Sequence, residues 1–509
     1  MRSTFVPFIC GVAAAAVAAT THATNTKLLF GGTIVAFDSK MESLNIIRNG
    51  SVLIHGDRIA AVNTIATPAG LPEDAELIDV TGQIVTPGFV DTHHHGWQTA
   101  LKTLGSNTSL AEYFSRYGEF AAADKYEPED VYLGQLAGLY EAINAGVTTI
   151  LDHAHHTWSN DTAYAGLNAS IESGARIFWA YAFHNISSLN YTVPDQVPNF
   201  REIADSGLLK GSAVELGIAY DAWGQDVDES RQVAQLAREY NVSVVTTHCL
   251  AGVWGILNQP RDLDVYGILN DSIPVVFSHA SLLTADDAQL LRARNQFISI
   301  TPESEMHYGH THPHSHLILD QASIGIDTHF TYSTDILTQA RFWLQSVRRH
   351  LFTNVLNEWR IPTITPMSAS QAFLLATRNG GLALRCKDLG IIEAGAKADI
   401  VVWDARQSPS LLGWRDPVAA VLLHASVADV LHVLVDGQFR KRDGKLVALD
   451  YQNLREKFQA SAEKIQDRWM QTPYPVLEGQ FMSGWDFEAP KVVDVVRGGG
   501  NSYTGPLLD

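Results

Sequence analysis

Between residues 84 and 335, hydrophobic side chains occur in short continuous runs that are separated by amphipathic stretches. The runs lie at 84–92, 147–153, 176–182, 214–220, 242–248, 274–280, 297–301 and 328–335. Helical signals lie between them, for example at 127–145, at 228–240 and from the capping residue Thr284 onward. Parallel strands that are covered on both faces read as continuous apolar runs, and eight of them with crossovers close into a barrel. The pattern therefore predicts an α/β fold, a (β/α)8 TIM barrel over residues 88–388.

Short strands with turn signals flank the predicted barrel on both sides. They occur in residues 27–87, where one precedes the turn at Gly31, and again in residues 389–450. We expect these two regions to pair into one small β-sandwich domain that is built from both chain ends. The last segment, 451–509, is expected to be a helix from Tyr451 to Gln471 and then a tail rich in glycine and proline.

The first apolar run ends in a His-x-His pair. Side chains alternate along a strand, so His93 and His95 share one face and are spaced to hold one cation. By itself, the pair would fit a surface histidine cluster. Later runs end in a similar way, in His248, His279 and Asp335. Because barrel enzymes carry their chemistry at the C-terminal ends of the strands, we expect these five side chains to lie at one level of the barrel. Three imidazoles and a carboxylate around a metal ion would leave room for water.

Four segments connect this pattern to a known family. They are residues 87–95 (PGFVDTHHH), 278–284 (SHASLLT), 301–306 (TPESEM) and 389–401 (LGIIEAGAKADIV). In this order they resemble the amidohydrolase superfamily, in the cytosine deaminase-like branch that includes the atrazine and triazine hydrolases. The similarity covers residues 27–445 and specifies the superfamily far better than the substrate.

The resemblance implies a site for one divalent metal ion. Its ligands would be His93, His95, His248 and Asp335. Asp335 would also serve as the general base, and His279 would hydrogen-bond the attacking water or the substrate. The run 214–220 lacks the lysine that bridges two metals in binuclear relatives, so a single ion is expected. Zinc is the expected metal, and Fe2+ is the alternative.

The chain departs from the family pattern at two places. Deaminases of this branch carry a glutamate three residues after the fifth-strand histidine, where this chain has Ala251. Its absence puts deamination of an aminopurine or aminopyrimidine in doubt. The seventh-strand segment carries Glu303 and Glu305 instead. One of these carboxylates either supplies the missing proton relay or caps the loop that follows, and the sequence leaves both readings open.

Four further residues are candidates for the wall of a substrate pocket. They are Trp97, Gln98, His155 and His310. For Trp97, packing beneath the first loop is the alternative. His155 follows the second run, where His153 and His156 are also candidates for substrate contact. His310 belongs to a histidine-rich stretch, residues 307–316, that we expect to form a lid or rim loop.

Composition excludes some partners. The chain has 509 residues, of which 46% are hydrophobic and 18% charged, as in ordinary globular proteins. Its net charge of -19 argues against nucleic acid or an anionic membrane as a partner, because both require basic patches. A small molecule is the expected partner, and a homodimer is compatible with the sequence.

The N-terminus predicts secretion. Residues 1–23 combine Arg2, a short apolar run and a small-residue motif, as a signal peptide does, with a buried apolar arm as the alternative. Eight Asn-x-Ser/Thr sequons follow, at Asn49, Asn107, Asn160, Asn168, Asn185, Asn190, Asn241 and Asn270. Only Cys249 and Cys386 would remain in the mature chain, too few for a disulfide framework. An extracellular glycoprotein is therefore expected.

Together these features predict a secreted, metal-dependent hydrolase. It would use metal-activated water to cleave a non-peptide C–N bond in an amide, a lactam or an aminoheterocycle of a small cyclic molecule. One alternative is a lyase, decarboxylase or dehydratase that uses the metal as a Lewis acid. The other is a catalytically silent binding protein on the same scaffold.

Overall fold

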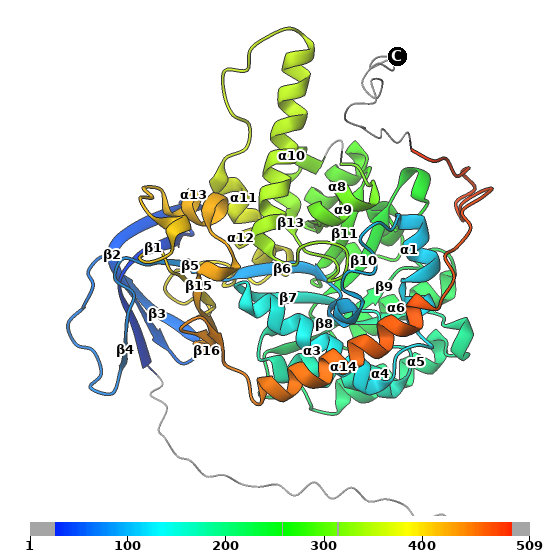
Figure 1. Cartoon of the computed structure of the whole chain (residues 1–509), viewed down its shortest axis with the longest axis horizontal. Coiled ribbons are helices and arrows are strands. Elements are labelled where there is room, and N and C mark those ends of the chain that lie inside the picture. The colour runs from blue at the N-terminus through cyan, green and yellow to red at the C-terminus, as the bar shows by residue number, and fades with distance from the viewer. Residues whose placement is uncertain (1–25, 257, 313–314, 491–509) are drawn as a thin grey trace, which may run out of the picture.

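The computed structural model describes residues 26–256, 258–312 and 315–490 (Figure 1). The expected signal peptide, residues 1–23, lies outside this part of the chain. In the part that is described, no helix is both long and apolar enough to cross a membrane. Cys249 and Cys386 are both free thiols.

Eight parallel strands form the central sheet, and their order in the sheet follows their order along the chain. They are β6 (Phe89–His94), β7 (Val147–Ala154), β8 (Arg176–Phe183), β9 (Val214–Tyr220), β10 (Val245–Leu250), β11 (Val275–Ser281), β12 (Phe297–Ile300) and β13 (Ala322–Ile324). The last strand meets the first because the N–H groups of Ile326 and Asp327 donate to the His93 carbonyl at 3.2 and 2.9 Å. The predicted (β/α)8 barrel is confirmed.

Helices cover the outside of this barrel (Figure 1). The longer ones are α3 (Pro128–Asn144), α4 (Asn160–Ser173), α5 (Val193–Asp205), α6 (Val227–Glu239), α8 (Ala285–Arg294), α10 (Ile336–Asn357) and α14 (Tyr451–Met470). The shorter helices, which do not all lie on the outside of the barrel, are α1 (Leu110–Arg116), α2 (Glu119–Ala122), α7 (Pro260–Asp264), α9 (Pro302–Tyr308), α11 (Ala369–Leu375), α12 (Arg378–Ala383) and α13 (Pro417–Ala419). The helix expected from Tyr451 is α14, whose buried Trp469 belongs to the same core cluster as Trp97 in the first barrel loop.

A nine-stranded mixed sheet lies at one side of the barrel and contains strands from both chain ends (Figure 1). Its strands are β1 (Thr26–Asp38), β2 (Ser43–His55), β3 (Arg58–Asn63), β4 (Glu76–Asp79), β5 (Ile84–Pro87), β14 (Ile400–Trp403), β15 (Val430–Val435), β16 (Gln438–Arg442) and β17 (Lys445–Leu446). The two ends join where β5 pairs antiparallel with β14. A buried ion pair fixes this sheet to the barrel, because Arg176 at the start of β8 lies 3.0 Å from Asp399 and also contacts Asp436.

The first predicted run, residues 84–92, is divided between the two sheets. β5 belongs to the small sheet and β6 to the barrel, and Gly88 lies between them. A side chain at Gly88 would have its Cβ only 2.1 Å from the Thr148 hydroxyl. Glycine is therefore required where the chain passes from one sheet to the other.

The prediction of the eighth strand at residues 328–335 is wrong. The actual strand, β13, is a three-residue element that precedes it. Residues 328–330 are buried, so they read as a strand, yet they form an irregular connection to α10. Asp335 is the N-cap of α10 and accepts a hydrogen bond from the Thr338 N–H at 2.8 Å. It therefore lies at a helix start and not at a strand end.

Candidate metal centre and active site

Four side chains converge at the C-terminal end of the barrel with the spacing of metal ligands. Asp327, which follows β13, places Oδ1 3.4 Å from His93 Nε2 and 3.2 Å from His95 Nε2. His95 Nε2 in turn lies 3.3 Å from His248 Nε2. Ligands at about 2.0–2.1 Å from a tetrahedral ion are about 3.3–3.4 Å apart. Because His93 Nε2 is buried and has no hydrogen-bond partner, the arrangement fits a bound cation.

Outer partners orient each of these ligands. The Nδ1 atoms of the three histidines are all occupied: His93 lies 2.8 Å from the Ser278 hydroxyl, and His95 donates to the His153 carbonyl. His248 donates to Asp221 at 2.7 Å. In each ring, Nε2 is therefore left for the ion.

Hydroxyl groups hold Asp327 in the same manner. Ser304 and Tyr332 donate to its Oδ2 at 2.6 and 2.9 Å. Oδ1 therefore faces His93 and His95.

Burial and neighbouring charges favour the protonation states that bind metal. Burial lowers the pKa of His93 well below its ordinary value, and the contact with Asp327 offsets only part of this shift. Burial alone would raise the pKa of Asp327, but His93 and His95 lower it well below the usual range. A neutral imidazole and an ionised carboxylate are the forms that coordinate cations.

His279 lies beside this cluster. Its ring centroid is 5.0 Å from that of His93 and 5.6 Å from that of His248. The backbone has φ values of +64° at His279 and +51° at Ala280, a left-handed conformation that is costly for residues other than glycine. The ring is held at Nδ1 by the Thr301 hydroxyl at 2.8 Å. Nδ1 is therefore occupied, and His279 lines the cavity, while its predicted hydrogen bond to water or substrate stays a prediction.

The cluster lies at the base of a cavity of about 470 Å³. Its wall is largely apolar, with Leu110, Phe114, Phe120, Phe183, Leu250, Ile256 and Met482 among the lining residues. Imidazoles and four carboxylates, those of Glu119, Asp221, Glu229 and Asp327, also line it. A cavity of this size and character suits a small molecule with both apolar and polar parts.

The structure separates the predicted substrate contacts into two pairs. His155 and His310 line the cavity, and the His310 ring lies 5.2 Å from that of His279. Trp97 and Gln98 are fully buried and do not line it. Trp97 packs against Tyr126 and Trp158, which is the packing alternative for this residue. Gln98 contacts the cavity wall from behind, because its amide donates a hydrogen bond to the hydroxyl of Tyr113, which lines the cavity.

Neither seventh-strand carboxylate lines the cavity. Glu303 accepts hydrogen bonds from Ser333 and Gln339. Glu305 is fully buried behind His279, with Oε1 3.5 Å from its Nδ1 and 2.9 Å from the Thr301 N–H. Glu305 is therefore placed to position His279 rather than to reach a substrate.

The sequence prediction missed the four carboxylates that line the cavity and placed Asp335 among the metal ligands. Asp335, predicted as a ligand, is absent from the cluster because it caps α10. Asp327 occupies that place, and its signal was available: Ser323-Ile324-Gly325-Ile326 is an apolar run that ends in an aspartate. Asp221, which also lines the cavity, had a comparable signal, because it directly follows the run 214–220, whereas Glu119 follows no such run.

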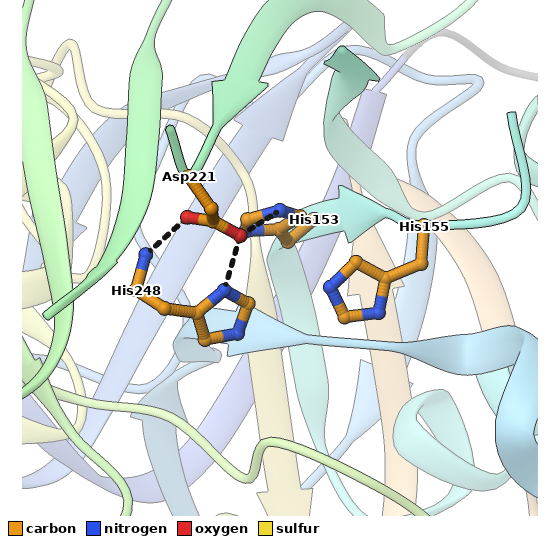
Figure 2. A group of neighbouring side chains, drawn as sticks. All are labelled: His153, His155, Asp221 and His248. Atoms are coloured by element: carbon orange, nitrogen blue, oxygen red, sulfur yellow. Dashed lines mark hydrogen bonds and ion pairs between the residues drawn. The ribbon is translucent and has the colours of Figure 1, made fainter. Parts of the chain in front are cut away.

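A second group of side chains adjoins the first. His153 in β7, His155 just after it and Asp221 after β9 face one another beside His248 (Figure 2). Burial lowers the pKa of both His153 and His155 well below the ordinary value, so both rings are neutral. Burial would raise the pKa of Asp221, but its interactions with the His248 and His153 rings lower it below the usual range.

Comparison with known proteins identifies the family. Residues 84–440 match the model of the amidohydrolase family, and the chain belongs to it. A protein of Pelotomaculum thermopropionicum named 5-methylthioadenosine/S-adenosylhomocysteine deaminase is 24% identical over 86% of this chain and 97% of its own length. A 5'-deoxyadenosine deaminase of Methanothermobacter thermautotrophicus is 25% identical over 82% of this chain and 95% of its own.

Solved structures show the same fold. An adenosine deaminase from Xanthomonas campestris with bound zinc superposes with a TM-score of 0.73 at 18% identity and covers 88% of this chain and 99% of its own. The zinc complex of atrazine chlorohydrolase from Arthrobacter aurescens has a TM-score of 0.72 at 20% identity and covers 86% of this chain and 100% of its own.

Proposed function

We propose that this protein is a metal-dependent hydrolase that cleaves a non-peptide C–N bond of a small cyclic molecule. The observation that carries the proposal is the group of ligand atoms from His93, His95, His248 and Asp327, three of whose separations are 3.2–3.4 Å, beneath a largely apolar cavity. The ion, with Zn2+ expected and Fe2+ next, would supply an activated water molecule at neutral pH.

The chain's own residues divide the remaining work. Asp327 would accept a proton from the attacking water, because its Oδ1 faces the ligand nitrogens while its Oδ2 is held by Ser304 and Tyr332. His279 would hydrogen-bond the oxygen on which charge develops. Glu305 would keep the His279 ring in this orientation.

The relatives favour an aminoheterocycle as the substrate. Proteins named as deaminases of adenosine derivatives match almost over their full length. Ala251 cannot deliver the proton that a departing amine needs, and it is buried. Two cavity carboxylates, Asp221 and Glu119, are the groups closest in kind to the missing glutamate. We therefore place amine-bearing rings first among the substrates, and cyclic amides next.

The test is hydrolysis by zinc-loaded protein of a panel of amine-bearing purines, pyrimidines and triazines, together with lactams and linear amides. Release of ammonia or an amine from a ring substrate, lost in Asp327→Ala and retained in Asp335→Ala, is the expected result. Water-independent turnover would indicate a lyase. Protein that binds zinc but converts no compound, and that shows no ammonia release from any ring, would contradict the proposal.

We also propose that the protein is secreted and glycosylated. The signal-peptide pattern of residues 1–23 motivates this proposal, and the asparagines of all eight sequons are exposed. Intact-mass analysis of the native protein should find a chain that begins near Thr24 and carries N-linked sugar. A native chain that retains Met1 and carries no sugar would contradict it.

A further inference from the structure

We propose that the barrel holds a second divalent cation beside the first, bound by His153, His155 and Asp221. This second site lies outside the ligand set on which the proposed function rests. It is built on the ends of two other strands, β7 and β9 (Figure 2). One ligand atom from each of these residues and one from His248 lie within 4.8 Å of one another.

The spacing of Asp221 and His153 is that of two ligands rather than that of a hydrogen-bonded pair. Asp221 Oδ2 lies 3.4 Å from His153 Nε2. This distance is long for a charge-assisted hydrogen bond, which is about 2.7–2.9 Å. It matches the separation of about 3.3–3.4 Å between two ligands of one tetrahedral ion.

Asp221 has a free lone pair in the required direction. Its Oδ1 accepts hydrogen bonds from the His248 N–H at 2.7 Å and from the Thr247 hydroxyl at 3.1 Å. Its Oδ2 accepts only from His248 Nδ1, at 2.7 Å. A carboxylate offers about four acceptor positions, so one remains on Oδ2, on the side of His153. The three hydrogen bonds fix the carboxylate in place without using this position.

His155 contributes a buried imidazole whose Nδ1 has no partner among the described residues. Within that part of the chain, no hydrogen bond or ion pair is made by Nδ1, whereas Nε2 forms an ion-pair contact. Its Nε2 lies 2.8 Å from the carboxylate of Glu119, which lines the open side of the cavity. An unpaired buried nitrogen costs free energy, and a bound cation would remove that cost.

His248 belongs to the first site and separates it from the second. Its Nδ1 is 2.7 Å from Asp221, closer than the roughly 3.0–3.4 Å between ligands of one ion, while its Nε2 faces His95. The second set is therefore two imidazoles and one carboxylate, a set that suits zinc and other first-row transition metals and leaves positions open towards the cavity.

A second ion would compensate for the missing proton relay at Ala251. Bound between Asp221 and His155, it would face the cavity and accept the lone pair of a substrate nitrogen, a role that rests on the proposed function. The site itself does not depend on that role, because it is defined by ligand geometry.

Metal counting tests the site without reference to turnover. Full-length protein is stripped with a chelator, reloaded with Zn2+, desalted and analysed by plasma mass spectrometry. We expect two ions per chain in the unchanged protein and one in His155→Gln and in His153→Asn. His156→Gln is the matched control: His156 is also buried and adjacent, but it packs against Gly166 of α4, so this variant should keep two ions.

Zinc anomalous diffraction then locates the ions. Two peaks are expected, one among His93, His95 and Asp327 and the other between His153 and Asp221. A single peak, or one ion per chain in the unchanged protein, would overturn the second site and leave the proposed function intact. So would a second ion that persists in both His155→Gln and His153→Asn and is lost in His312→Gln, since it would lie in the histidine-rich loop. Two ions without turnover of any ring substrate would instead contradict the proposed function alone.

Discussion

The assignment of Asp327 as a metal ligand, in place of the predicted Asp335, gives the sharpest test of the metal centre. Asp327→Ala removes one of four ligand atoms, the one that lies 3.2–3.4 Å from two ligand nitrogens. Loss of an outer hydrogen-bonding partner typically costs about 10–100-fold in metal affinity. Loss of a ligand should cost more, so we expect zinc affinity to fall at least 100-fold and turnover to disappear.

Asp335→Ala is the matched control, because it removes an aspartate from the same segment of chain. Asp335 accepts hydrogen bonds from the Thr338 N–H at 2.8 Å and from its hydroxyl at 2.7 Å. Loss of an N-cap should lower the free energy of unfolding by about 1 kcal/mol. Zinc affinity and turnover should not change.

The assays are competition for zinc with a chromophoric chelator, steady-state turnover and urea unfolding. If Asp335→Ala lost zinc, or if Asp327→Ala kept it at the affinity of the unchanged protein, the placement of the eighth strand would be refuted.

Three further predictions concern other parts of the molecule. Glu305→Gln should reduce kcat by about 10–100-fold with little change in metal content, because Glu305 positions His279, whereas Glu303→Gln should leave kcat unchanged in the same assay. Arg176→Met should lower the free energy of unfolding, measured in urea, by about 3–5 kcal/mol, because it leaves Asp399 buried without its cation; a loss below 1 kcal/mol would contradict this. Burial lowers the pKa of Lys441 to about 8, below the unfolded value of about 10.5. Folding therefore disfavours the charged form, and the stability of the unchanged protein relative to Lys441→Met should rise from pH 8 to pH 10.5; a constant difference across that range would show that the shift is absent.

The sequence was sufficient for most of the barrel because the strands are buried on both faces. Seven of the predicted runs overlap barrel strands, and His93, His248 and His279 lie at or near the ends of three of these runs. The eighth strand was misplaced because β13 has three residues, too few for any pattern, while the buried connection after it is richer in β-forming residues.

Carboxylates outside the motifs could not be found from the sequence. Asp221 follows β9 and Glu119 begins α2, and their relation to the histidines depends on how these two elements are placed around the barrel. Glu305 was singled out, but its direction was not predictable: α9 begins at Pro302 and turns this side chain behind His279 and away from the cavity. Periodicity indicates which face a residue occupies on its own element, but not what another element places opposite it.

The contact between β13 and β6 also determines when, during folding, the metal site can form. The His93 carbonyl pairs with the backbone of Ile326 and Asp327, so the first metal ligand of the barrel and the last come together only when the ring of strands closes. Contacts between such distant parts of a chain form late and slowly in folding. A nascent chain consequently has no complete ligand set until its last barrel strand has been synthesised and docked. An ion captured at that point would stabilise finished barrels alone, by an amount set by its concentration relative to its dissociation constant. The supply of metal would then influence how much of the protein reaches the closed barrel. Without metal, more of the chain would remain in open, protease-sensitive forms.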